Sequence, residues 1–210
     1  VTERFADAIR TASGENQLTG FAVDLGGTKT AAARFEAGQV VNKTQSPTNG
    51  NTDPDTLVAL MRGQLRNLGY RSGDLLGVAV TGRVDQQGNW YAVNRNTLSK
   101  IGAFPLAQRV REVIGPASAI NDAAAATLAE HRLGAGRGHQ NFAYVTVSTG
   151  VGGGLILNDR LHQSPNGLAG HVGFTSGAGG QRQCGSGRIG TVESAASGWA
   201  IAAAAKALGH

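Results

Sequence analysis

Two glycine-rich segments, each beside short apolar runs, constrain the possible folds of this chain most strongly. The first, Asp24-Leu-Gly-Gly-Thr28-Lys29, follows the apolar run Phe21–Leu25. The second, Ser148–Gly154, carries four glycines in five positions between the predicted strands Phe142–Ser148 and Leu155–Leu157. Glycine accounts for 32 of the 210 residues without a collagen-like period, which indicates tight turns and close backbone approaches. The repeated order of strand, glycine-rich turn and strand favours two similar halves, although a single glycine-rich hairpin is common.

The remaining pattern alternates predicted strands and helices, which is typical of an α/β protein. Asp53 and Pro54 predict a helix start, because Asp is a good cap and Pro suits the first turn. Leucines then recur at helical spacing as far as Gly69. The other predicted elements are strands over Ala31–Phe35, Val40–Thr44, Leu76–Val80 and Ala117–Ile120, helices over Leu106–Ile114, 123–132 and Glu193–Leu208, and a loop over 163–192.

Composition and charge exclude several function classes. Lys and Arg exceed Asp and Glu by 19 − 14 = 5, but the basic residues are scattered with no run of three, so no nucleic-acid partner is expected. The single Cys184 excludes an intrachain disulfide and gives no sign of a secreted protein. Residues 1–19 carry charges where a signal peptide needs an apolar core, and no apolar stretch is long enough to cross a membrane. We therefore expect a cytoplasmic protein with no membrane partner.

The two glycine-rich segments are candidate phosphate sites. Glycines after a strand let backbone N–H groups close on phosphate oxygens, while Thr28 adds a hydroxyl donor and Lys29 a cation. Asp24, at the strand end, would hold a water or Mg²⁺ near those phosphates. The alternative is an ordinary hairpin turn at 24–29 and a sharp hairpin in a crowded core at 148–154. The spacing of Asp24–Lys29 matches neither the P-loop nor the dinucleotide-binding motif.

Asn121-Asp122 stands where a predicted strand ends and a helix begins. A carboxylate held there points into the crevice at the strand ends, which suits a general base that takes a proton from a sugar hydroxyl. The alternative is that the pair only caps the helix. His171 and Glu193, further along the chain, suit the binding of sugar hydroxyls, although a lone His in a loop is more often a surface residue.

Together, five segments in this order resemble the ROK family (repressors, open reading frames and kinases) of the actin–hexokinase superfamily. The segments are Asp24–Lys29, Thr81-Gly82-Arg83, Asn121-Asp122, Ser148–Gly154 and Gly167–Glu193, and the resemblance runs from about Phe21 to the end of the chain. Within the family, Gly-Leu-Ala-Gly-His171 and Val-Ser-Thr-Gly-Val-Gly-Gly-Gly are similar to the bacterial N-acetylmannosamine kinases. The resemblance implies an α/β, actin/hexokinase-like ATPase fold of two lobes with a cleft between them. A tail or short helix over 1–20 would precede an N-terminal lobe over 21–120 and a C-terminal lobe over 121–210.

The resemblance also implies a role for each matching residue. Asp122 would be the base for the sugar 6-hydroxyl. The residues that would line the sugar pocket are Gly82, Arg83, Thr97, Asn121, His171 and Glu193. The residues that would surround Mg²⁺ and the phosphates of ATP are Asp24, Gly26, Gly27, Thr28, Lys29, Thr149 and Gly150. Phosphoryl transfer needs in-line positioning and charge neutralisation more than covalent help from the protein.

The chain departs from the family pattern in two places. The family's zinc motif supplies one His and three Cys, whereas the matching positions here hold Phe174, Cys184, Ser186 and Thr191. No structural zinc is therefore expected, because such a site needs four ligands. Family members also continue through further helices and a glycine-rich adenine-binding stretch beyond the position of His210, so we expect the second lobe to be truncated.

The sequence thus predicts an ATP-dependent kinase that phosphorylates N-acetylmannosamine at the 6-hydroxyl, in the catabolism of sialic acid and amino sugars. Its ligands would be the sugar, ATP and Mg²⁺, and we expect a homodimer. One alternative keeps the fold but changes the sugar to glucose or fructose. Another is a sugar-sensing regulator, although the 20 residues ahead of Phe21 are too few for a winged-helix module. A third is a non-catalytic sugar-binding fragment.

Overall fold

The computed structural model describes residues 18–50, 52–94, 98–177 and 182–209. The chain divides into two compact units. The first comprises the residues up to 92 together with 97–122, and the second comprises 93–96 together with 123–210. The tail or helix predicted over 1–20 lies almost entirely outside the described residues, and so does the predicted sugar residue Thr97.

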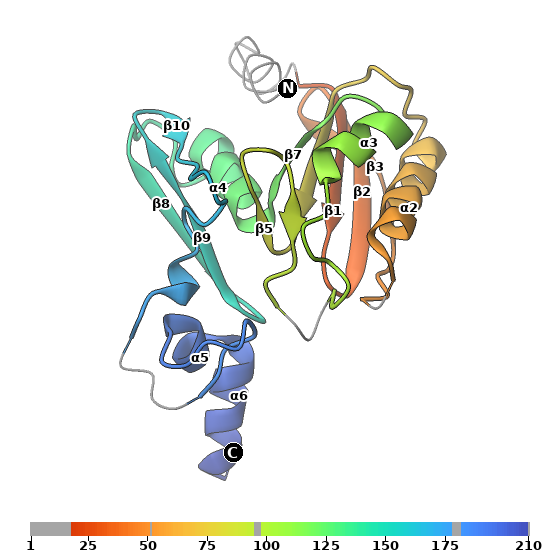
Figure 1. The fold of residues 1–210 in the computed structure, drawn as a ribbon. Coiled ribbons are helices and arrows are strands. Elements are labelled where there is room, and N and C mark those ends of the chain that lie inside the picture. The colour runs from red at the N-terminus through yellow and green to blue at the C-terminus, as the bar shows by residue number, and fades with distance from the viewer. Residues whose placement is uncertain (1–17, 51, 95–97, 178–181, 210) are drawn as a thin grey trace. The chain divides into compact units, whose positions relative to one another are not determined.

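The first unit is built on a five-stranded sheet with the strand order β3-β2-β1-β4-β7 (Figure 1). β1 (Gly20–Leu25), β2 (Lys29–Glu36) and β3 (Gln39–Pro47) form an antiparallel meander, which includes the hairpin predicted at the first glycine pair. β4 (Leu76–Val80) pairs in parallel with β1, and β7 (Ser118–Asn121) pairs in parallel with β4. The carboxyl ends of β1, β4 and β7 therefore share one edge of the sheet.

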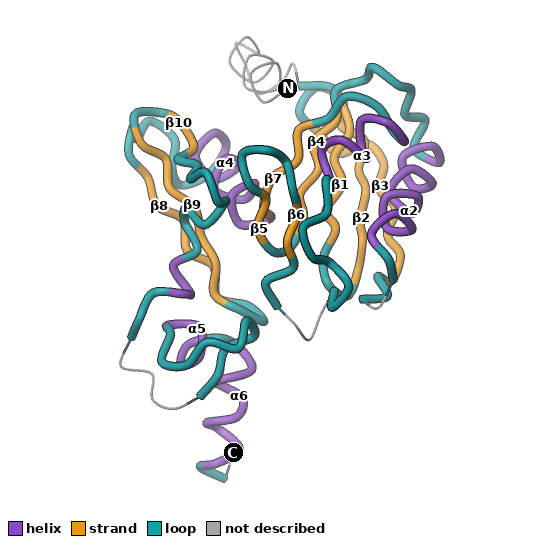
Figure 2. Tube along the Cα trace, viewed as in Figure 1, coloured by secondary structure: helices purple, strands orange, loops and turns teal. Residues whose placement is uncertain are grey.

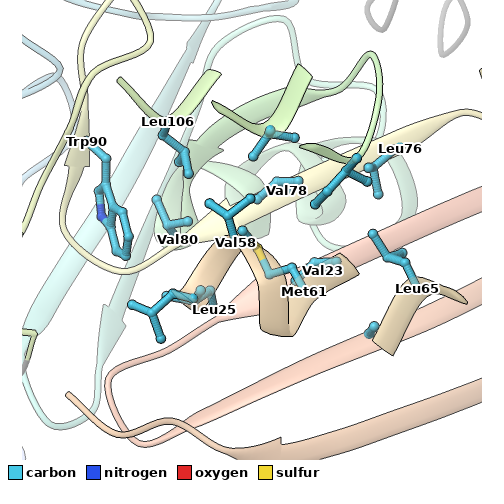
Figure 3. Packing of buried hydrophobic residues seen from close by; sticks show 14 of the residues in the cluster. Val23, Leu25, Val58, Met61, Leu65, Leu76, Val78, Val80, Trp90 and Leu106 are labelled. Carbon is cyan, nitrogen blue, oxygen red and sulfur yellow. The ribbon is translucent and has the colours of Figure 1, made fainter. Parts of the chain in front are cut away.

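Two helices, α2 (Pro54–Asn67) and α3 (Leu106–Val113), lie side by side on one face of this sheet (Figure 1). The Asp53 carboxylate accepts a hydrogen bond from Thr56 N at 3.0 Å, so the predicted cap of α2 is confirmed. Apolar side chains from these helices and from β1 and β4 form the core (Figure 3). Its largest fully buried members are Trp90, Leu25, Leu57, Met61, Leu65, Leu76, Leu98 and Leu106.

A small antiparallel hairpin belongs to the same unit. It pairs β5 (Arg83–Val84) with β6 (Trp90–Tyr91). Trp90 is fully buried in the core, and its indole Nε1 donates to Thr81 O at 2.8 Å. The buried indole thus fixes the hairpin at the carboxyl end of β4.

The second unit contains a three-stranded antiparallel sheet with the order β10-β9-β8 (Figure 2). β8 (Phe142–Val147) and β9 (Val151–Leu157) form a hairpin, and β10 (Arg160–Leu161) pairs with the end of β9. Because β9 begins at Val151, the prediction that Gly152–Gly154 belong to the turn is wrong.

At each of these three strand positions, neighbouring side-chain or backbone atoms fill the space that a side chain would need. A Cβ on Gly152 would lie 3.2 Å from Ala123 Cβ, and one on Gly154 would overlap Thr127, both on α4 (Asp122–Leu133). On the opposite face, a Cβ on Gly153 would lie 3.2 Å from the carbonyl oxygen of Gly170. The glycines therefore allow a helix and a loop to approach the two faces of β9 closely.

The predicted single helix over Glu193–Leu208 is also wrong. α5 (Val192–Ala196) and α6 (Gly198–Ala207) are separated by Ser197, whose backbone is extended with ψ at 157°. The hydroxyl of Ser197 caps α6, and Gly198 N donates to Ser148 O in the β8–β9 turn at 2.7 Å. The preceding loop contains one short 3-10 helix, η2 (Val172–Phe174). In the part of the chain that the structure describes, no helix has the length and apolar character needed to span a bilayer.

Candidate active site

Polar groups gather at the carboxyl edge of the parallel strands in the first unit. Leu25 of β1 pairs with Val80 of β4, and Val80 pairs with Asn121 of β7, so the three residues form one row across the sheet. Val80 is followed by Thr81-Gly82-Arg83, and Asn121 by Asp122. Residues at the carboxyl ends of neighbouring parallel strands share a crevice outside the sheet. The fold thus brings three of the sequence-predicted segments to one edge.

Asp24 is the penultimate residue of β1 and remains exposed to solvent. Partial burial nonetheless raises the pKa of its carboxyl, and the positive charge of Lys29 opposes that rise. In the turn that follows, Gly26 N donates to Lys29 O at 2.9 Å, so this predicted phosphate donor already serves the hairpin. A carboxylate in this position is the ligand type that Mg²⁺ prefers.

Asn121 ties the end of β7 to the segment after β4. Its side-chain Nδ2 donates to Gly82 O at 2.5 Å and to Asp122 Oδ1 at 2.8 Å. Asp122 is half-buried and is the first residue of α4, rather than a cap that precedes the helix. The Asn121 amide therefore orients one carboxylate oxygen of Asp122. The end of β7 and the start of α4 hold the backbone of this pair in place. This arrangement suits a general base.

Arg83 is held by an aromatic ring of its own hairpin. Its guanidinium carbon lies 3.6 Å from the centre of the Tyr91 ring, and Tyr91 Oη donates to Asp85 Oδ2 at 3.1 Å. Burial alone would raise the pKa of Asp85, but its hydrogen bonds with Asn89 and Tyr91 lower it below the ordinary value. An ionised Asp85 therefore anchors the tyrosine that carries Arg83.

Glu193, on α5, is a buried carboxylate with an exposed fraction of 8%. Its Oε2 accepts from Val151 N at 3.0 Å, and its Oε1 accepts from Gly185 N at 3.1 Å. A Cβ on Gly150 would lie 2.6 Å from Oε2, so the carboxylate sits directly against the turn that carries Thr149. Glu193 thus links the β8–β9 turn to the loop at 184–187, while each oxygen keeps a second lone pair for another donor.

His171 lies in a loop that packs closely against β9 both before and after this residue in the chain. Gly170 has a φ of +80°, and a Cβ there would lie 2.6 Å from Gly154 Cα. A Cβ on Gly173 would overlap the carbonyl oxygen of Val151. The imidazole is half-buried and stacks on Phe174, with ring centres 5.6 Å apart and planes 26° apart. Packing therefore fixes the position of this side chain.

The four positions at which the sequence resemblance would place zinc ligands do not fit that metal. Phe174 has no donor atom, and the Thr191 hydroxyl accepts from Ser194 N in the capping box of α5. Cys184 Sγ lies 2.9 Å from Ser186 Oγ, which leaves one thiol where a structural site needs four ligands. Across the described residues, no three His, Cys, Asp or Glu side chains gather as a metal site.

Known proteins resemble this chain in sequence. The ROK family model matches residues 20–210. The chain belongs to the ROK family. An N-acetylmannosamine kinase of Pasteurella multocida (strain Pm70) is 40% identical over 190 residues, which cover 87% of this chain and 61% of the relative. One of Vibrio vulnificus (strain YJ016) is 39% identical over 189 residues, covering 89% and 64%. This ROK chain therefore spans less than two thirds of the length of these curated relatives.

A solved structure shares the fold. A ROK family glucokinase from Streptomyces griseus, in complex with glucose and AMPPNP, superposes with a TM-score of 0.76 at 29% identity. The match covers 90% of this chain and 61% of the glucokinase. The predicted α/β, hexokinase-like ATPase fold is thereby confirmed.

Sequence reasoning missed the residues that hold the candidate side chains. Tyr91 and Asp85 support Arg83, and Arg188 lies with its guanidinium carbon 5.0 Å from the centre of the Phe174 ring. Asn94 was also missed. It lies close to the loop at 184–187, because a Cβ on Gly185 would be 2.8 Å from its Nδ2. The Asp85-Gln-Gln-Gly88 turn pattern was a readable signal for the Arg83 hairpin, because Asp and Gly both favour turns.

Proposed function

We propose that this protein is a sugar kinase that transfers the γ-phosphoryl group of ATP to the 6-hydroxyl of N-acetylmannosamine. The observation that carries the proposal is the position of Asp122, on rigid elements at the shared edge of β1, β4 and β7. Relatives at 40% and 39% identity that are named N-acetylmannosamine kinase support the choice of sugar. The glucokinase structure with a bound ATP analogue supports the use of ATP.

In this proposal Asp122 accepts the proton of the 6-hydroxyl as the sugar oxygen attacks the γ-phosphorus. The new O–P bond forms while the bond to the ADP oxygen breaks, so ADP leaves and the proton stays with Asp122. Asn121 orients the base through its 2.8 Å hydrogen bond to Oδ1. The chemistry needs no covalent intermediate, because positioning and charge neutralisation supply most of the catalysis in this reaction class.

The residues proposed for the phosphates come from both glycine-rich hairpins. In the first unit they are Asp24, Gly26, Gly27, Thr28 and Lys29, and in the second they are Thr149 and Gly150. Asp24 would hold Mg²⁺ through a carboxylate oxygen or a bound water, and Mg²⁺ neutralises phosphate charge when bound. The exposed cation of Lys29 and the hydroxyls of Thr28 and Thr149 add charge and donors.

The residues proposed for the sugar are Gly82, Arg83 and Asn121 in the first unit and His171 and Glu193 in the second. Thr97, outside the described residues, completes the proposed set. Arg83 and His171 are each held by an aromatic ring, and Glu193 by two backbone N–H groups. Preorganised side chains of this kind lose little entropy when they bind a sugar.

Asp122→Asn tests the proposed base in the longest natural chain that contains this sequence. Asn at this position keeps the oxygen that accepts from Asn121, so sugar affinity should change less than about twofold. Turnover should fall by roughly two orders of magnitude or more, because general-base catalysis contributes that much. Asp55→Asn, on the exposed surface of α2, serves as the control. Full turnover in Asp122→Asn would reduce Asp122 to a helix-start residue.

Glucose is the second candidate substrate, because the matched ROK glucokinase was solved with glucose bound. A coupled assay of ADP release over N-acetylmannosamine, glucose and fructose separates the two. We expect the highest kcat/KM with N-acetylmannosamine, and a higher value with glucose would transfer the proposal to that sugar.

We further propose that the protein works in the cytoplasm as a homodimer and that 21–120 and 121–210 act as its two lobes. Sedimentation equilibrium tests the dimer directly. A single monomeric species at micromolar concentration would refute it.

A further inference from the structure

The loop that carries His171 has two described segments, residues 171–177 and 182–191, which we call its first and second limbs. One limb holds η2, and Thr175 O accepts from Val192 N at 3.0 Å. Gly177 N on this limb donates to Gly190 O on the other limb at 2.9 Å, and within that other limb Cys184 N donates to Arg188 O at 2.8 Å. These contacts pair the limbs close to α5, but they do not reach the side chain of His171.

The Phe174 ring makes the connection to His171. The imidazole stacks on it at 5.6 Å between centres, and the Arg188 guanidinium lies 5.0 Å from its centre. Arg188 belongs to the second limb and His171 to the first, so one aromatic ring contacts a side chain from each. Ring stacking and a cation over a ring both favour a defined geometry.

We propose that Phe174 and Arg188 are positioning residues that hold His171 in place of a metal cross-link. Phe174 stands where the sequence resemblance would put a zinc-binding His, and Cys184 is the one remaining thiol of the set. A phenyl ring has no lone pair, so the exchange removes a ligand and adds a stacking surface at the same point. Backbone hydrogen bonds pair the limbs near α5, and the aromatic and cation–ring contacts extend this connection to the His171 side chain without a metal.

The test compares Phe174→Leu, Phe174→Tyr and Arg188→Gln, with Arg160→Gln on the exposed strand β10 as a matched control. Leu keeps apolar volume but removes the ring, whereas Tyr keeps the ring. Two readouts are independent of catalysis. One is the NMR signal of the His171 imidazole, assigned with His171→Gln, because a stacked ring shifts it. The other is zinc per chain by elemental analysis, together with the unfolding temperature before and after EDTA.

The His171 signal should move in Phe174→Leu and Arg188→Gln and stay nearly in place in Phe174→Tyr and Arg160→Gln. Zinc should be far below one per chain, and EDTA should leave the unfolding temperature unchanged. One zinc per chain with a lower unfolding temperature in EDTA would overturn the metal-free link. A His171 signal that ignores Phe174→Leu would overturn the positioning role.

The final readout rests on the proposed function, because it uses the affinity for N-acetylmannosamine measured by calorimetry. Phe174→Leu and Arg188→Gln should each weaken binding by about tenfold, and Phe174→Tyr should restore it. Unchanged affinity in both variants would overturn the link between the stack and the sugar. If the wild-type chain binds no N-acetylmannosamine and holds no zinc, while the His171 signal still moves in Phe174→Leu and Arg188→Gln, the sugar assignment is refuted and the stack is supported.

Discussion

Gly170→Ala should be among the more damaging single-methyl additions in the second unit. Gly170 has a φ of +80°, a region where a residue with a Cβ costs about 1–2 kcal/mol. The same Cβ would also lie 2.6 Å from Gly154 Cα and 2.7 Å from Gly153 O, both backbone atoms of β9 that cannot rotate away. Overpacking of this kind costs about 1–3 kcal/mol. Together the two effects predict a loss of roughly 2–5 kcal/mol in the free energy of unfolding.

Gly138→Ala provides the control, because Gly138 has the same φ of +80° and nothing within 4 Å of its Cβ position. It should lose only the backbone-strain part, about 1–2 kcal/mol. Urea unfolding followed by far-UV circular dichroism measures both variants, and the slope of the transition shows whether two-state analysis applies. If Gly170→Ala loses no more than Gly138→Ala, the close contact between the His171 loop and β9 is refuted.

Three further predictions concern the first unit. Asp24→Asn should stabilise the fold near pH 7. Burial raises the native pKa of Asp24, so the wild-type protein loses stability as pH rises above the unfolded pKa, and the gain from Asn should vanish under acidic conditions. Thermal melts of both proteins across pH measure this difference. Tyr91→Leu should raise the KM for sugar roughly 2- to 30-fold with little change in kcat, since the ring contact to Arg83 is worth about 0.5–2 kcal/mol; an unchanged KM would separate Arg83 from the sugar. Met61→Ala, in the fully buried core, should cost about 2–5 kcal/mol by chemical denaturation, and a loss below 1 kcal/mol would contradict its packing.

Local sequence signals predicted the elements whose causes are local. The cap at Asp53 is a contact across three residues, from its carboxylate to Thr56 N, and the pattern of Asp before Pro encodes it. The convergence of Asn121 and Gly82 was also predictable in outline. Both follow apolar strand runs, and neighbouring parallel strands end at one edge.

The predictions that failed depend on contacts between distant segments. An Ala-rich run from Glu193 onward favours one helix, but the break at Ser197 is stabilised by a bond from Gly198 N to Ser148 O in another hairpin. No pattern within the run encodes a partner so far away along the chain.

The sequence predicted the helix that begins at Pro54 and the strand over Leu76–Val80, and its residue types show that the zinc ligand set is incomplete at Phe174. Periodicity and residue type suffice for these features because they act over a few residues. Only the fold shows that Gly152–Gly154 belong to a strand, where α4 and Gly170 fill the space beside them. It alone decided how the candidate side chains are held, because a ring under Arg83 or two N–H groups on Glu193 come from residues that only folding brings within reach.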